Sequence, residues 1–138
     1  MCGKVAQSMS WAEFAALHGI RLEPGDEPLG AGAGDRVEIG TPMRLLRVVA
    51  RDDLGRRRLV RMRWGLVPSW QDDPNKLAGT IHARAETIEQ KPSFKNAFAE
   101  RRGILVVKTF NEGEELASGK TRQYVVTPKD GREIAFDE

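Results

Sequence analysis

Apolar side chains near the N-terminus of the chain recur at the spacing of an α-helix. Trp11, Phe14 and His18 fall on one helical face, and Ser10 with Glu13 forms the pattern of a capping box where that face begins. A glycine, a common helix stop, follows His18 directly. We therefore predict a helix of about two to three turns after Ser10, with His18 in a structural role.

Alternating side chains favour strands in the next part of the chain. Segments 43–50 and 58–67 are rich in valine, leucine and arginine, and the turn-forming residues 52–55 lie between them. This pattern predicts a β-hairpin. The two faces of its second strand are formed by alternate side chains: Leu59, Arg61 and Arg63 on one, and Val60, Met62 and Trp64 on the other.

Three further segments predict a loop, a helix and a strand. Residues 23–42 hold many glycines and prolines and predict a long loop. Residues 92–101 carry an apolar stripe at helical spacing, which predicts a second helix that starts at Ser93 or the residue before it. Residues 104–107 are apolar throughout, which predicts a short buried strand.

The C-terminal part of the chain predicts two more strands. Residues 123–127 and 133–136 flank the turn-forming sequence Pro128–Gly131. Strands therefore outnumber helices, and most connections between them are antiparallel. We predict an α+β fold, a mostly antiparallel, barrel-like sheet with a few short flanking helices, as a single domain over residues 1–138.

The composition is that of a globular domain. The chain has 138 residues, of which 40% are hydrophobic and 30% charged. No apolar run approaches the ~20 residues of a membrane span, and the N-terminus lacks the apolar core of a signal peptide. We expect a cytoplasmic protein. A single cysteine with two histidines excludes an intrachain disulfide and a structural zinc site, so we predict no metal and no cofactor.

The charges are distributed unevenly. The net charge is only +2, yet residues 44–63 carry eight arginines against Asp52 and Asp53. Such a stretch is typical of a phosphate-binding surface, but it is equally typical of a charged hairpin that is merely well solvated. Charge alone leaves these two interpretations evenly balanced.

The cysteine at position 2 has a chemistry that no internal cysteine shares. Removal of Met1, which aminopeptidases carry out before small residues, leaves an α-amine and a thiol on Cys2. The amine, whose pKa in an unstructured peptide is roughly 7.7–8.0, can form a Schiff base with an aldehyde. The thiol can then close a five-membered thiazolidine ring, favoured because the closure is intramolecular. The alternative is an incidental cysteine in a flexible terminus.

Four ordered segments decide between these alternatives. They are Met1–Lys4 (MCGK), Arg63–Trp70 (RWGLVPSW), Thr80–Thr87 (TIHARAET) and Lys91–Phe94 (KPSF). Together they closely resemble the SRAP family, the SOS-response-associated peptidases or abasic-site processing proteins, whose usual strings are M-C-G-R, R-W-G-L-x-P-x-W, N-A-R-x-E-T and K-P-x-F. The resemblance is clear over residues 1–115 and weaker beyond.

The resemblance implies a function as well as a mostly β fold. Family members capture the ring-opened abasic sugar in single-stranded DNA through the N-terminal cysteine, and the crosslink protects the lesion from strand cleavage. Cys2 matches that nucleophile, and Arg84 matches an arginine that grips a phosphate beside the lesion. The DNA groove would also include Lys4, Trp64 and Trp70, although core packing is an equally good interpretation of Trp64.

Two further residues match the family's chemistry, and two features depart from it. Glu112 stands where the family has an acid/base glutamate near the cysteine. His82 replaces the family's asparagine before Ala-Arg, and an imidazole can hydrogen-bond or titrate there. The chain ends before the family's C-terminal catalytic histidine, so we expect a domain that lacks the C-terminal segment, with His82 and Glu112 as the acid/base groups beside Cys2.

Three functions remain open at this point. The first is a covalent abasic-site sensor in the DNA-damage (SOS) response with enzyme-like chemistry. The second is a shortened module that binds single-stranded DNA without efficient crosslinking. The third is a self-processing cysteine peptidase, a hydrolase, as the family's name suggests. General proteolysis is the weakest of these, because the sequence places no base beside the thiol.

Overall fold

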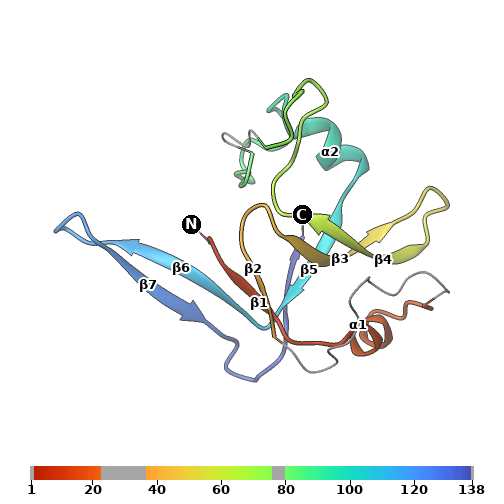
Figure 1. Ribbon diagram of the computed structural model, residues 1–138, viewed down its shortest axis with the longest axis horizontal. Coiled ribbons are helices and arrows are strands. Elements are labelled where there is room, and N and C mark those ends of the chain that lie inside the picture. The colour runs from red at the N-terminus through yellow and green to blue at the C-terminus, as the bar shows by residue number, and fades with distance from the viewer. Residues whose placement is uncertain (1, 23–36, 76–79, 138) are drawn as a thin grey trace.

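The computed structural model describes residues 2–22, 37–75 and 80–137. Its strands form two four-stranded sheets, with the orders β2-β1-β6-β7 and β4-β3-β5-β8, and every strand pair is antiparallel. The predicted α+β class is confirmed (Figure 1). The elements are β1 (Val5–Gln7), α1 (Trp11–Leu17), β2 (Glu38–Gly40), β3 (Leu45–Arg51), β4 (Arg57–Arg63), α2 (Lys95–Glu100), β5 (Gly103–Val107), β6 (Thr109–Glu115), β7 (Thr121–Val126) and β8 (Ile134–Asp137).

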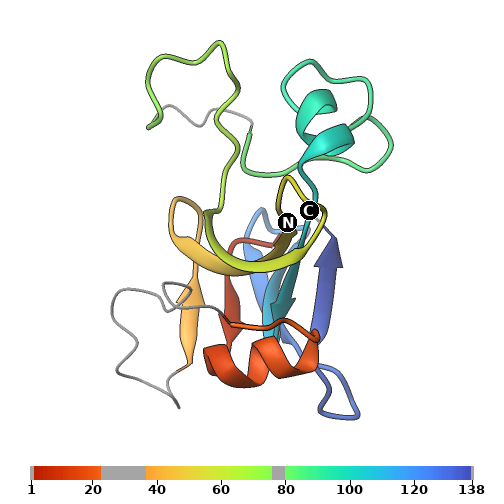
Figure 2. The ribbon, with the colours of Figure 1, turned by 90° about the vertical axis from the view of Figure 1, so that its right-hand side faces the viewer.

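The two helices lie at opposite ends of the molecule, as Figure 1 and the perpendicular view in Figure 2 both show. Helix α1 begins with the predicted capping box: the Ser10 hydroxyl accepts from the Glu13 N–H at 3.2 Å, and the Ser10 N–H donates to the Glu13 carboxylate at 2.8 Å. In the described residues, no helix has the length and apolar character needed to cross a membrane.

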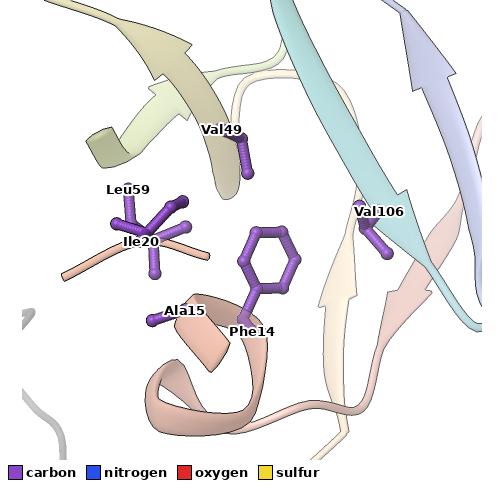
Figure 3. Close-up of a cluster of buried hydrophobic side chains, with 6 residues drawn as sticks. All are labelled: Phe14, Ala15, Ile20, Val49, Leu59 and Val106. Atoms are coloured by element: carbon purple, nitrogen blue, oxygen red, sulfur yellow. The ribbon is translucent and has the colours of Figure 1, made fainter. Parts of the chain in front are cut away.

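Two hydrophobic clusters use opposite faces of the sheet β4-β3-β5-β8. One lies under α1, where Phe14 is 1% exposed and packs near Val49 and Val106 (Figure 3). The other contains Val48 and Val107 on the opposite face. Consecutive residues of one strand point to opposite faces, so Val48 and Val49 serve different clusters. The second cluster is the one against which Cys2 packs.

A buried glutamine joins the two sheets. Gln7 is 2% exposed at the end of β1, and its amide donates to the carbonyl oxygens of Arg47 at 2.9 Å and Val106 at 2.8 Å. Its side-chain oxygen accepts from the Arg47 N–H at 3.0 Å. These three hydrogen bonds all go to strands of the other sheet, which fixes β1 and thereby the chain that leads to Cys2.

Most predicted elements are confirmed, and several bounds shift. The hairpin of β3 and β4 is present, but β4 ends at Arg63 rather than at residue 67, because Gly65 adopts a φ of 123° and breaks the extended chain. The second helix begins at Lys95, after a turn in which the Phe94 N–H donates to the Lys91 carbonyl at 2.9 Å. Strand β7 starts two residues earlier than predicted.

Three strands were not predicted. β1 and β2 have only three residues each, and β2 lies inside the predicted loop 23–42, of which residues 23–36 lie outside the described residues. β6 contains Asn111, Gly113 and three glutamates, residue types that are rare in strands. It forms because β7 pairs with it along its length.

Candidate functional site

Cys2 lies immediately before β1, at the edge of the second hydrophobic cluster. It is half-buried, and its thiol is 3.5 Å from the Lys4 carbonyl oxygen. The same carbonyl accepts a hydrogen bond from the Asn111 N–H of β6 at 2.9 Å. The segment in front of β1 therefore runs beside β6, which brings the single cysteine of the chain close to the next strand of its sheet.

His82 contacts Cys2 directly although 80 positions separate them. Its Nε2 lies 2.6 Å from the Cys2 carbonyl oxygen. The Trp64 ring meets the His82 ring edge-on, with centroids 5.8 Å apart and an interplanar angle of 80°. The indole N–H of Trp64 donates to the Ile81 carbonyl at 3.1 Å. The segment that carries His82 is thus held against the end of β4 and over Cys2.

Glu112 on β6 is the third group at this place. A hydrogen bond from the α-ammonium at the chain's N-terminus holds the pKa of Glu112 below its ordinary value, and the Gly113 N–H and the charge of His82 act in the same direction. The carboxyl is therefore ionised at neutral pH. The charges that act on Glu112 are those of the chain's N-terminus and of His82, and His82 in turn contacts Cys2. The three residues predicted as catalytic, Cys2, His82 and Glu112, thus lie in one region.

A half-open cavity of about 380 Å³ adjoins these groups. Cys2, Trp64 and His82 line one part of it, and the rest is lined mainly by apolar side chains, with Arg63, Thr80 and Arg101 among them. The apolar part of the wall accepts rings or hydrocarbon. The apolar lining residues include Val48, Met62, Leu105, Phe94, Phe98 and Phe136.

The residues predicted to bind DNA are spread around this centre. Lys4 and Arg84 are exposed, and Trp70 is 64% exposed, so its ring is available for stacking. Trp64 is different, because it is half-buried, packs against the second cluster and uses its N–H within the protein. Packing is therefore a structural role of Trp64, in addition to any contact with a ligand.

The arginine-rich stretch is largely engaged within the protein. Arg47 and Arg61 both pair with Glu38, at 3.3 Å and 3.0 Å, although they face each other across β3 and β4. Arg56 pairs with Asp52 at 2.8 Å. Three of the eight arginines of this stretch are thereby paired with carboxylates. The charge pattern left two interpretations open, a phosphate-binding surface and a solvated hairpin, and these ion pairs favour the solvated, internally paired hairpin.

Sequence reasoning missed the contacts that assemble the site. The role of Gln7, the pairing of Asn111 with Lys4, and the indole bond to the Ile81 carbonyl depend on pairing between distant segments. The local signal that could have pointed to Gln7 is its place directly after the apolar pair Val5–Ala6. In the described part of the chain, no three histidine, cysteine or acidic side chains group together as metal ligands.

Similar structures support the fold. A protein from Bacteroides thetaiotaomicron superposes with a TM-score of 0.74 at 19% identity, over 99% of this chain and 58% of that chain. A protein from Bordetella bronchiseptica superposes with a TM-score of 0.69 at 22% identity, over 99% of this chain and 62% of that chain. This chain therefore spans about three fifths of the length of either structure.

Similar sequences come from bacteria and vertebrates. The abasic site processing protein YoqW of Bacillus subtilis is 38% identical over 65 residues, which are 47% of this chain and 29% of YoqW. The abasic site processing protein HMCES of Gallus gallus is 33% identical over 90 residues, which are 62% of this chain and 27% of HMCES. The family model described as SOS response associated peptidase (SRAP) matches residues 1–137, and the chain therefore belongs to the SRAP family.

Proposed function

We propose that this protein processes abasic sites in single-stranded DNA by forming a covalent crosslink through Cys2. Two relatives bear the name of abasic site processing protein. The observation that carries the proposal is the convergence of Cys2 with His82 and the ionised Glu112. Aldehyde capture needs the amine and the thiol of Cys2, and a carboxylate nearby can carry the protons while an imidazole contacts the cysteine.

The reaction begins with removal of Met1, which frees the α-amine of Cys2. The ionised Glu112 accepts a proton from the Cys2 ammonium, and the neutral amine adds to the aldehyde carbon of the ring-opened abasic sugar. Glu112 returns its proton to the hydroxyl of this adduct, which leaves as water and gives the protonated imine. The Cys2 thiol then adds its sulfur to the carbon of the protonated imine and gives its proton to Glu112. The thiazolidine that results carries one water less than the reactants.

The DNA would be held by sequence-independent contacts. Arg84 and Lys4 are exposed cations that can bind phosphate, and the exposed ring of Trp70 can stack on a base. The apolar cavity next to Cys2 keeps bulk water away from one side of the reacting carbon. These contacts supply affinity for single strands, whereas Cys2 supplies the selectivity for an aldehyde.

The test is a comparison of the wild type with Cys2→Ala. Each protein, shown by intact mass to lack Met1, is incubated with an abasic single-stranded oligonucleotide. We expect a heat-stable adduct from the wild type, with the summed mass of both reactants less one water, and no such adduct from Cys2→Ala. An equal yield of that adduct from Cys2→Ala would refute the proposal.

The same pair of proteins, wild type and Cys2→Ala, separates the two other functions. A module that only binds single-stranded DNA would shift the oligonucleotide in a native gel and release it on denaturation, with or without Cys2. A self-processing peptidase would lose Met1 in a cell-free translation system without aminopeptidase, and Cys2→Ala would keep it. Neither of these outcomes includes an adduct that has lost one water.

A further inference from the structure

Two contacts, one on each side of Gly3, attach the N-terminal segment with Cys2 to the rest of the fold. On one side, the Lys4 carbonyl accepts from the Asn111 N–H at 2.9 Å, which fixes the chain to β6. Gly3 follows towards the N-terminus, is exposed, and has no atom within 4 Å of the place where a side chain would stand. Glycine leaves the backbone free to rotate. Packing against the second cluster and the 3.5 Å contact of the thiol with the Lys4 carbonyl hold the Cys2 side chain, and a second attachment is needed to fix its backbone.

His82 provides that second attachment. Its Nε2 lies 2.6 Å from the Cys2 carbonyl oxygen, and a carbonyl only accepts hydrogen bonds, so Nε2 carries the proton. Nε2 therefore donates to Cys2 and holds the carbonyl of this residue in place.

Trp64 holds the segment from which His82 reaches Cys2. Its indole N–H donates to the Ile81 carbonyl at 3.1 Å, and its ring meets the imidazole edge-on. Trp64 is itself fixed at the end of the β3–β4 hairpin, because its N–H donates to the Arg44 carbonyl at 2.9 Å and its carbonyl accepts from the Met43 N–H at 2.9 Å. An unbroken series of contacts thus leads from the hairpin to Cys2.

We infer that His82 and Trp64 are positioning residues for the Cys2 aminothiol, His82 through the Cys2 carbonyl and Trp64 through the His82 segment. This inference rests on the proposed capture reaction. In this inference, Glu112 carries out the proton transfers and exposed side chains contact the DNA. Trp64 acts within the protein. Because a carbonyl tether orients the amine and the thiol, it changes the rate of the chemical step and leaves DNA affinity unchanged.

The experiment is a single-turnover series of four processed proteins: wild type, His82→Ala, His82→Asn and Trp64→Phe. Capture of an abasic oligonucleotide is followed at increasing protein concentration, which separates the maximal rate from half-saturation. The control is Trp11→Phe, since the indole N–H of Trp11 has no hydrogen-bond partner among the described residues and the ring packs near the first cluster. Thermal unfolding confirms that each variant is folded.

We expect His82→Ala to lower the maximal rate by about 10- to 100-fold with half-saturation unchanged, which is the size of a small misplacement of a reacting group. His82→Asn retains most of the rate because its amide also donates, and its pH profile superimposes on that of the wild type. Trp64→Phe, which keeps the ring and loses the N–H, lowers the maximal rate, and Trp11→Phe does not.

Three outcomes would overturn the inference. They are an unchanged rate in His82→Ala, an equal loss in His82→Asn and His82→Ala, and a loss confined to half-saturation. The same series with glyoxylate, a small aldehyde that needs no DNA contact, separates the two proposals. A wild type that captures glyoxylate with the expected dependence on His82, but does not capture abasic DNA, refutes the proposed function and leaves the positioning role intact.

Discussion

The individual residues of the site differ in how far the sequence predicts them. The chemistry of Cys2 follows from its position alone, because only a terminal residue can offer an amine together with its thiol. The candidates His82 and Glu112 come from the family resemblance, and the structure brings both next to Cys2. The carbonyl that His82 contacts could not be predicted, since the contact joins segments 80 positions apart.

Glu112 gives a prediction that separates its role from that of the histidine. With Met1 in place, the N-terminal ammonium, and then the Gly113 N–H and His82, hold the pKa of Glu112 below the ordinary 4.5, and the last two remain when Met1 is removed. The charged form, and any help it gives, is present above that ordinary value and is lost only as the pH falls through the folded value. We expect Glu112→Gln to slow capture by about 10²-fold or more at neutral pH.

The ratio of wild-type to Glu112→Gln rates, measured across pH, checks this. It stays constant from mildly acidic to mildly alkaline pH, where the amine of Cys2 controls both rates equally, and it falls only below the ordinary carboxyl pKa of 4.5. Glu114→Gln, two positions along β6, is the matched control. A ratio that changes around neutrality would show that another group performs the proton transfer.

At the scale of elements, the sequence predicted those helices and strands that are stabilised by interactions between nearby residues. The capping box fixed the start of α1, and alternation of side chains fixed the β3–β4 hairpin. Strands β1, β2 and β6 escaped prediction because they are stabilised by partners elsewhere in the chain: β1 pairs with both others. Their sequences are too short or too polar to favour a strand without those partners.

Helix α1 contains a second testable group. His18 is its C-cap, and its ring packs against Phe14 at 4.9 Å, with a buried Nε2 that has no partner among the described residues. Burial, and then the charge of Arg57, lower the pKa of His18 below 6.5. A histidine whose folded pKa is depressed stabilises the fold fully above its unfolded pKa, and this contribution is lost as the pH falls through the folded value.

We therefore expect the free energy of unfolding of the wild type to decrease on acidification below 6.5, and His18→Leu to lose less over the same interval. Chemical denaturation of both proteins at several pH values measures the difference. His82→Asn, which changes the other histidine of the chain, serves as the control and should follow the wild type. Parallel curves for wild type and His18→Leu would contradict the assignment to His18.

For the whole molecule, the important feature is how the two sheets are joined. Gln7 ties β1 to β3 and β5, and Lys108 links β5 to β6 within one continuous stretch of chain, its N–H donating to the Ala6 carbonyl at 2.7 Å. This junction fixes β1, and with it the chain that leads to Cys2. It depends on the complete fold, which is why segment-by-segment reasoning did not predict the role of Gln7 or of Lys108.

The distribution of charge over the molecule supports a last prediction. Three arginines of the arginine-rich hairpin, Arg47, Arg56 and Arg61, are paired with Glu38 or Asp52, so we expect DNA affinity to depend on cations outside these pairs, such as Arg84. We expect Arg84→Ala in a Cys2→Ala background to weaken single-strand binding and to flatten its logarithmic salt dependence by about 0.7 to 1 unit, the effect of one phosphate contact. Fluorescence anisotropy over a salt series measures this. Arg132→Ala is the control, because Arg132 pairs with Asp130 at 2.6 Å, and an equal change in that variant would show that Arg84 acts only through net charge.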